Sequence, residues 1–161
     1  MNLQVGLMSF EHMHQFSYAA ALNELPDVDL AALWDDDPAR LQAQGKNYGI
    51  PKLTSSLDEF LALPLDAVVI CSCNRRHREL TEKAARAGKH ILCEKPLATS
   101  VEDAQAMIDV CRKEGVKLMT AFPCRYIPQM KRARQIIQEG KLGEIFAVRT
   151  SNHGSMPGGW F

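Results

Sequence analysis

The chain of 161 residues is long enough for about one domain with a substantial core. Its 19 Lys and Arg residues balance 19 Asp and Glu residues. This neutrality argues against nucleic-acid and anionic-membrane partners, which select basic surfaces. No apolar run approaches the roughly 18 residues of a membrane span. No export signal precedes the first strand-like segment, so we expect a cytoplasmic protein.

Short apolar runs alternate with helical patterns along most of the chain. The run 67–70, Ala-Val-Val-Ile, is typical of a strand buried on both faces. We expect strands over residues 3–8, 28–34, 65–71, 90–93 and 116–121, and helices over residues 14–25, 75–87, 99–115 and 128–139, with a further helix starting near residue 38. This alternation predicts an α/β fold, a doubly wound parallel sheet of Rossmann type with right-handed connections.

Two helix starts carry capping signals. Asp37 before Pro38 is typical of an N-cap followed by the first helical residue. The helix after residue 98 starts with a capping box, either Thr99 with Glu102 or Ser100 with Asp103.

The connection after the first strand should contain glycines if it cradles a dinucleotide pyrophosphate, because only glycine lets the backbone approach so closely. The three glycine positions fall near Ser9, Glu11 and His14, none of which is glycine. Glu11 would repel a pyrophosphate unless its side chain points away. The free N–H groups at the start of the next helix and the Ser9 hydroxyl remain as phosphate donors, so phosphate binding at this loop is left open.

Metal binding is not expected. The five cysteines contain no C-x-x-C pair, and three of them lie in or beside apolar runs, where cysteine packs as a small hydrophobic residue. His12 and His14 are two residues apart on a forming helix, so their side chains should point to different sides and not share one ion. Packing or hydrogen-bonding roles are the favoured interpretation.

Asp35 follows the second strand, where a carboxylate accepts hydrogen bonds from the adenosine ribose of a dinucleotide. It lies 26 residues after Ser9 (35 minus 9), compatible with the usual spacing of about 20. If Asp37 caps the helix, Asp35 stays available for the ribose, where it would repel a 2′-phosphate and favour NAD over NADP. The alternative role of this acidic run is helix capping alone.

The turn Glu94-Lys95-Pro96 follows an apolar run, at the strand end where open α/β sheets bind ligands. Pro96 restricts the residue before it, so Lys95 is a rigid candidate for a ligand contact. The alternative is a surface turn between a strand and a helix.

Polar residues also follow two other strands. Asn74 can cap the next helix and still offer its amide to a ligand, and His77 lies in the first turn of that helix, near the cleft or in a structural role. Arg125, after the last of these strands, could hold a substrate hydroxyl or carboxylate.

These segments together resemble the Gfo/Idh/MocA family of NAD(P)-dependent oxidoreductases, which act mainly on sugars, cyclitols and related polyols. The resemblance rests on a strand ending near Asn74 and His77, on Gly-Lys-His-Ile-Leu-Cys-Glu-Lys-Pro-Leu-Ala over 88–98, and on Gly-Lys-Leu-Gly-Glu-Ile over 140–145. It departs from the family at the glycine-rich loop, which this sequence replaces with Ser9, Glu11 and His14. The family's Asp-x-x-x-His catalytic pair belongs to a second domain that this chain does not reach.

The resemblance implies roles for individual residues. Lys95 would be the catalytic residue that contacts substrate near the nicotinamide, next to a cis Lys95-Pro96 bond. Asp35 would bind the adenosine ribose, and Glu94 would help position the nicotinamide. The implied cofactor-binding set is Ser9, Phe10, His12, Asp35, Cys73, Asn74, His77, Glu94, Lys95 and Pro96, and the implied substrate contacts are Lys95 and Arg125.

The expected organisation is a dinucleotide-binding domain over 1–122, a connecting helical segment over 123–142, and the start of an incomplete C-terminal domain over 143–161. Residues 143–150 alternate between two faces like the first strand of an α+β domain. Because a domain seldom finishes on two aromatic residues, the ending Trp160-Phe161 suggests a chain cut short. The missing domain would bind substrate, and its sheet would make the full-length protein a homo-oligomer.

Three functions remain open at this point. The first is an oxidoreductase that moves hydride between NAD and a sugar, cyclitol or related polyol, of which this chain is the nucleotide-binding part and inactive alone. The second is a non-catalytic protein that binds a nucleotide or sugar on the same fold, since the glycine-rich loop is lost. The third is an assembly fragment that pairs through the strand expected over 143–150.

Overall fold

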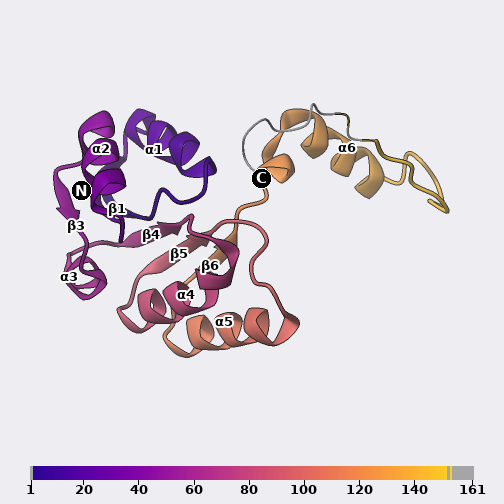
Figure 1. Cartoon of the computed structure of the whole chain (residues 1–161). Helices are drawn as coiled ribbons and strands as arrows, with labels where there is room; N and C mark the ends of the chain where they lie inside the picture. Colours follow the sequence, from indigo (N-terminus) through magenta and orange to yellow (C-terminus); the bar gives the residue numbers. More distant parts are fainter. Residues whose placement is uncertain (1, 152, 154–161) are drawn as a thin grey trace. The chain divides into compact units, whose positions relative to one another are not determined.

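The structure, a computed structural model, describes residues 2–151 and 153. Its internal contacts divide the chain into two compact units, Met1–Phe122 and Pro123–Phe161 (Figure 1). Each unit is described by itself below.

The first unit is built on one sheet of six parallel strands in the order β3-β2-β1-β4-β5-β6. The strands are β1 (Leu3–Met8), β2 (Val28–Trp34), β3 (Lys52–Thr54), β4 (Ala67–Ile70), β5 (His90–Cys93) and β6 (Leu118–Thr120). The order reverses between β1 and β4, which is the arrangement of a doubly wound Rossmann sheet. The predicted fold class is confirmed. The sequence interpretation missed β3, which has only three residues, and the short helix after it.

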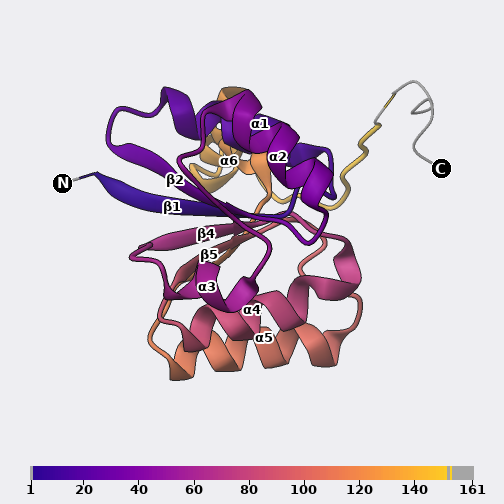
Figure 2. The same cartoon turned by 60° about the vertical axis from the view of Figure 1, so that its left-hand side comes forward.

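Helices cover both faces of this sheet (Figure 2). One face carries α1 (His14–Glu24) and α2 (Pro38–Tyr48), and the other carries α3 (Leu57–Ala62), α4 (His77–Arg86) and α5 (Val101–Lys113). Each face buries its own hydrophobic cluster. Leu33 and Val69 belong to the cluster under α1 and α2, whereas Val68 and Ile70 belong to the cluster under α3, α4 and α5. The alternation along β4 therefore fills both cores, as expected for a strand buried on both faces.

Gly6 in β1 permits close packing against α3. A Cβ atom at this position would lie 2.5 Å from Phe60 Cζ and 2.7 Å from Leu65 Cδ1. Real Cβ atoms do not approach so closely, so any larger residue would displace the Phe60 ring from the sheet.

The helix caps agree in part with the sequence. Asp37 caps α2 as predicted, accepting from Ala39 N and Arg40 N. Of the two capping alternatives for α5, the structure selects Ser100, whose Oγ accepts from Asp103 N. The predicted cap at Asn74 is wrong, because a 3-10 turn, η1 (Asn74–Arg76), precedes α4. Arg76 is the N-cap of α4 and makes no side-chain capping bond.

The second unit contains a 3-10 turn, η2 (Pro123–Tyr126), and α6 (Pro128–Gln138). The strand predicted over 143–150 is not formed: these residues have neither strand nor helix. A strand is held by hydrogen bonds to a neighbouring strand, and the described part of this unit supplies none. Residues 154–161, and with them the predicted ending Trp160-Phe161, lie outside the described residues. Within the described range, no helix is long and apolar enough to cross a membrane.

Candidate functional site

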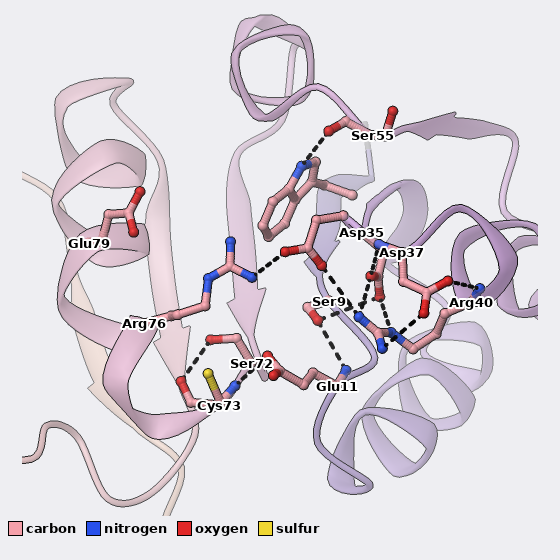
Figure 3. Close-up of polar contacts among 12 residues, drawn as sticks. Ser9, Glu11, Asp35, Asp37, Arg40, Ser55, Ser72, Cys73, Arg76 and Glu79 are labelled. Atoms are coloured by element: carbon pink, nitrogen blue, oxygen red, sulfur yellow. Dashed lines mark hydrogen bonds and ion pairs between the residues drawn. The ribbon is translucent and has the colours of Figure 1, made fainter.

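The polar residues singled out in the first unit gather at the carboxyl ends of β1, β2, β4 and β5. All strands are parallel, so these ends share one edge of the sheet. β1 and β4 are neighbours in the sheet, but the chain runs outward from β1 to β3 before returning to β4. In such sheets, ligands bind in the crevice outside this switch point. Figure 3 shows the part of this edge formed by the ends of β1, β2 and β4.

Ser9, at the first expected glycine position, has a glycine-like backbone. Its φ of 73° lies in the left-handed region, where it is the only non-glycine residue among those described. The conformation is held by hydrogen bonds from Ser9 N to Trp34 O at 2.8 Å and from Glu11 N to Ser9 Oγ at 3.0 Å. The loop thus keeps the turn of a glycine-rich loop, but its serine hydroxyl is buried and occupied.

The N–H groups of this loop are already bonded within the protein. Phe10 N donates to Asp35 Oδ2, and His12 N donates to Cys71 O. In the first turn of α1, His14 N donates to His12 Nδ1 and Gln15 N to His12 O. The N–H groups of residues 9–12, 14 and 15 are therefore already bonded in this conformation, because the loop folds back on itself and on the end of β4, and phosphate binding at this loop stays a prediction.

Asp35 is buried rather than available. Arg40 grips it with two hydrogen bonds, Nε to Oδ2 at 2.9 Å and Nη2 to Oδ1 at 2.7 Å, and Phe10 N and Asp37 N also donate to it. Burial works to raise the pKa of Asp35, but the bonds from Arg40 and the two backbone groups outweigh it and lower the pKa. The expectation that capping by Asp37 leaves Asp35 free is wrong, since Arg40, in the first turn of α2, binds the Asp35 carboxylate.

A second arginine connects the ends of β2 and β4. Arg76 Nη1 donates to Asp36 Oδ2 at 2.6 Å, and its guanidinium lies 5.1 Å from the centre of the Trp34 ring (Figure 3). The Trp34 indole in turn donates to Ser55 O. This contact spans the side of the edge where the sequence placed an adenosine ribose.

Phe10 and His12 have packing and hydrogen-bonding roles. The Phe10 ring is buried between Phe16 and Tyr48, with ring centroids 5.4 and 5.7 Å away. The side chain of Phe10 therefore packs in the core. The rings of His12 and His14 lie 4.7 Å apart, edge to face. The expectation that they point to different sides is wrong because α1 starts at His14, which leaves His12 outside the helix.

His12 is an acceptor at Nδ1, which takes a hydrogen bond from His14 N at 3.3 Å. Burial lowers the pKa of His12, and the nearby His14 lowers it further, which favours a neutral imidazole protonated at Nε2. Among the described residues, no group of three or more His, Cys, Asp or Glu side chains is placed to hold a metal ion.

Glu94 is the centre of a buried network. Its Oε1 accepts from Tyr18 Oη at 2.7 Å and from His14 Nδ1 at 2.9 Å, and its Oε2 accepts from Lys95 N at 2.6 Å. Burial works to raise the pKa of Glu94, but these bonds, led by that from Tyr18, lower it. Glu94 therefore stays ionised and ties the end of β5 to α1.

The turn after Glu94 contains a cis Lys95-Pro96 peptide bond, as the resemblance implied. His77 is fully buried and contacts this turn: its Nδ1 lies 2.9 Å from Pro96 O, and its Nε2 lies 3.2 Å from Ser72 O. Both partners are carbonyls, so a neutral ring donates to one of them and an imidazolium to both. His77 thus joins the ends of β4 and β5, and Lys95 is exposed above it. Both ring nitrogens of His77 thus face protein acceptors, and its expected place along the cofactor stays a prediction.

Glu11 crosses the switch point. Its Oε2 accepts from Cys73 N at 2.9 Å, so the loop after β1 is bonded to the segment after β4 (Figure 3). Asn74, next to Cys73, is exposed. Arg125 lies in η2 of the second unit, and its role as a substrate contact stays a prediction.

Three residues of this edge were missed by the sequence interpretation. Tyr18 lies four residues after His14, so the two share one face of α1, and this spacing was a usable signal. Arg40 lies in the first turn after three aspartates, which also indicates an ion pair. Arg76 gave no signal, because its partners Trp34 and Asp36 lie at the end of a different strand, β2.

The fold and this edge define a nucleotide-binding domain of the Rossmann class. The model of an oxidoreductase family with an NAD-binding Rossmann fold matches residues 5–122. The chain therefore belongs to the Gfo/Idh/MocA family of oxidoreductases, as the resemblance implied.

Individual relatives support this membership. Inositol 2-dehydrogenase from Rhizobium meliloti is 35% identical over 158 residues, which cover 98% of this chain and 47% of that protein. D-apiose dehydrogenase from Paraburkholderia graminis is 34% identical over 147 residues, 91% of this chain and 38% of that protein. The crystal structure of an oxidoreductase from Agrobacterium radiobacter in complex with NAD+, L-tartaric acid and magnesium matches with a TM-score of 0.83 and 27% identity, over 89% of this chain and 42% of that chain. This chain spans less than half the length of these relatives.

Proposed function

We propose that this chain is the nucleotide-binding part of a dehydrogenase that moves hydride between NAD and a carbon of a sugar, cyclitol or related polyol. The observation that carries the proposal is the Glu94-Lys95-Pro96 turn. A buried, ionised Glu94 fixes the end of β5, and an exposed Lys95 follows it beside the switch point. The relatives named above as acting on inositol and D-apiose support the substrate class.

The residues at the β5 end fit the nicotinamide half of NAD. Lys95 places an ammonium group where it can donate hydrogen bonds to a substrate hydroxyl and favour its loss of a proton. Glu94 holds the backbone of Lys95, and His77 holds Pro96, so both act as positioning residues. The bound NAD supplies the hydride acceptor. The exposed amide of Asn74 is expected to contact the cofactor. Arg125 is expected to contact a hydroxyl or carboxylate of the substrate.

The other half of the edge supports NAD more than NADP. Asp35 faces Arg40 in this conformation, but Asp36 and Asp37 keep about half of their side-chain surface exposed. Three aspartates at the ribose end repel a 2′-phosphate, although Arg40 and Arg76 offset part of their charge.

A non-catalytic nucleotide-binding or sugar-binding protein is the second candidate. The bonded N–H groups of residues 9–12, 14 and 15 and the Glu11 carboxylate favour it, because they leave the phosphates of a dinucleotide few donors. Catalysis by a full-length protein would exclude it.

The test is a variant at Lys95 in the full-length protein, because the nucleotide-binding part alone is expected to be inactive. With NAD and a panel of inositols and pentoses, Lys95→Met should lower kcat at least about 100-fold while Kd for NAD changes less than about threefold. Lys113→Met, at the end of α5, is the matched control and should keep wild-type activity. Undiminished turnover by Lys95→Met, or no NADH formed from any of these substrates, would overturn the proposal. Sedimentation of the full-length protein tests the accompanying prediction of a homo-oligomer.

A further inference from the structure

Glu11 is the feature of this edge that nucleotide binding does not explain. It stands where a glycine-rich loop would have a glycine, and its carboxylate reaches across the switch point to Cys73 N. Figure 3 shows its side chain extended from the loop after β1 toward the turn that starts η1. A dinucleotide that binds at the switch point passes its pyrophosphate through this crevice.

The surroundings of Glu11 neutralise little of its negative charge. The carboxylate is exposed, and it accepts from one neutral N–H group. Arg75 is a cation near Glu11. A hydrogen bond with Cys73 is the largest cause that raises the pKa of Arg75, and the negative charge of Glu11 raises it further. Arg75 is exposed, so water and salt screen its attraction and it compensates Glu11 only in part.

The loop offers little to offset this repulsion. Phe10 N, Glu11 N, His12 N and Gln15 N all donate to protein acceptors, and Glu11 itself takes the N–H of Cys73. A pyrophosphate therefore has to displace the carboxylate, overcome its charge, or both.

We propose that Glu11 sets a weak affinity for NAD by occupying the pyrophosphate crossing with its own negative charge. This inference rests on the proposed NAD-dependent function. Repulsion between two like charges a few ångströms apart in water raises Kd roughly fivefold. Displacing the hydrogen bond between Glu11 and Cys73 N raises Kd further. Most of the effect should lie in the rate at which NAD dissociates, since changes within one site alter koff more than kon.

The experiment compares Kd for NAD of the full chain with that of Glu11→Gln and Glu11→Gly, by calorimetry. Gln keeps an oxygen for Cys73 N but removes the charge, and Gly removes both. Glu24→Gln makes the same charge change at the exposed far end of α1. We expect Glu11→Gln to bind NAD roughly threefold to tenfold more tightly than wild type, Glu11→Gly more tightly still, and Glu24→Gln like wild type.

Two further measurements separate charge from packing. Adenosine has no phosphate, so its Kd should be equal for wild type and Glu11→Gln. Raising NaCl to about 0.5 M screens exposed charges and should narrow the difference in NAD affinity between the two proteins.

The outcomes separate this inference from the function on which it rests. If wild type binds NAD and Glu11→Gln binds it no more tightly, or if Glu24→Gln gains as much, the inference falls and the proposed function stands. If none of the proteins binds NAD, both fall. Tighter binding by Glu11→Gln that persists at high salt and extends to adenosine would also overturn the role of charge.

Discussion

Asp35 accepts five hydrogen bonds in one buried carboxylate: two from Arg40, one each from Phe10 N and Asp37 N, and a longer one from Ser9 Oγ at 3.5 Å. The group therefore joins the loop after β1, the end of β2 and the first turn of α2. Its charge has become part of the scaffold of the site. We expect ligand contacts at this end from the groups around it, such as the exposed Asp36 and the partly buried Arg76.

Replacing Asp35 should be costly at neutral pH. Asp35→Asn leaves Arg40 without its charge partner and should lower the free energy of unfolding by about 2–4 kcal/mol. The pKa of Asp35 is lowered in the folded state, so its stabilisation is present above the unfolded pKa of about 4 and is lost as pH falls below it. Urea unfolding should show the gap between wild type and variant closing toward pH 3. A pH-independent gap, or one as small as for the exposed Asp27→Asn, would contradict this account.

Ser9 combines a left-handed backbone with a buried hydroxyl that accepts from Glu11 N. Ser9→Ala loses the acceptor and keeps the backbone conformation, so it should destabilise by about 1–2 kcal/mol. Ser9→Gly loses the same bond but relieves roughly 1 kcal/mol of backbone strain. Denaturant midpoints should therefore rank Ser9→Gly above Ser9→Ala, and the reverse order would refute the strain argument.

At the scale of elements, α1 and β5 are joined through Glu94. Its partners Tyr18 and His14 lie one turn apart on α1. A single face of this helix therefore binds Glu94, at the end of β5 and next to Lys95. The exposed lysine is thus positioned by a helix that lies far from it in sequence. Disturbing these contacts should affect catalysis as well as stability.

The Tyr18 hydroxyl tests that connection. Tyr18→Phe removes a bond to an ionised carboxylate, so it should destabilise by about 1.5–3 kcal/mol and raise the pKa of Glu94. NMR titration of Glu94 measures the second effect. Tyr48→Phe, which loses an exposed bond to Phe16 O at 3.3 Å, is the matched control and should cost less than about 1 kcal/mol. Equal losses of stability in the two variants would show that the bond from Tyr18 to Glu94 stabilises the fold no more than an exposed hydrogen bond does.

The contact between β1 and α3 is the other element-level constraint. Gly6→Ala should destabilise by about 1–3 kcal/mol, because its Cβ would overlap the Phe60 ring. Phe60→Leu in the same chain should recover part of that loss, and a double-mutant cycle would give a coupling of about 1 kcal/mol. Additive effects would mean that Phe60 is not what Gly6 accommodates.

At the scale of the whole molecule, both hydrophobic clusters are drawn from the first unit. In the described part of the second unit, no side chain is buried, and Met130, Ile137 and Leu142 are at least about half exposed. The first unit therefore contains the packing that a cooperative domain requires.

This distribution predicts independent folding of the first unit. A piece comprising residues 1–122 should unfold cooperatively with a Tm within about 3 °C of that of the 161-residue chain, because the removed segment contributes little buried apolar surface. Calorimetry measures both. A loss of cooperativity in the shorter piece would place essential packing beyond Phe122.

The pattern of the chain was sufficient for the fold and for part of the site. The periods of apolar residues predicted five of the strands and all the helices between them except α3, because burial on one or two faces imposes those periods on any sequence. The same reasoning failed at β3, which is too short to show a period, and at 143–150, where alternation predicted a strand that has no partner. Strand pairing is a relation between segments, and one segment cannot specify it.

The sequence by itself determined which residues reach the carboxyl edge, since the end of each strand is local information. It also placed Glu94, Lys95 and Pro96 together, because they are consecutive. Only the tertiary structure decided that Arg40 takes Asp35, that His77 is buried under Pro96, and that Glu11 spans the switch point. The reason is geometric: hydrogen bonds act over about 3 Å, and only folding brings side chains from different strand ends within that reach.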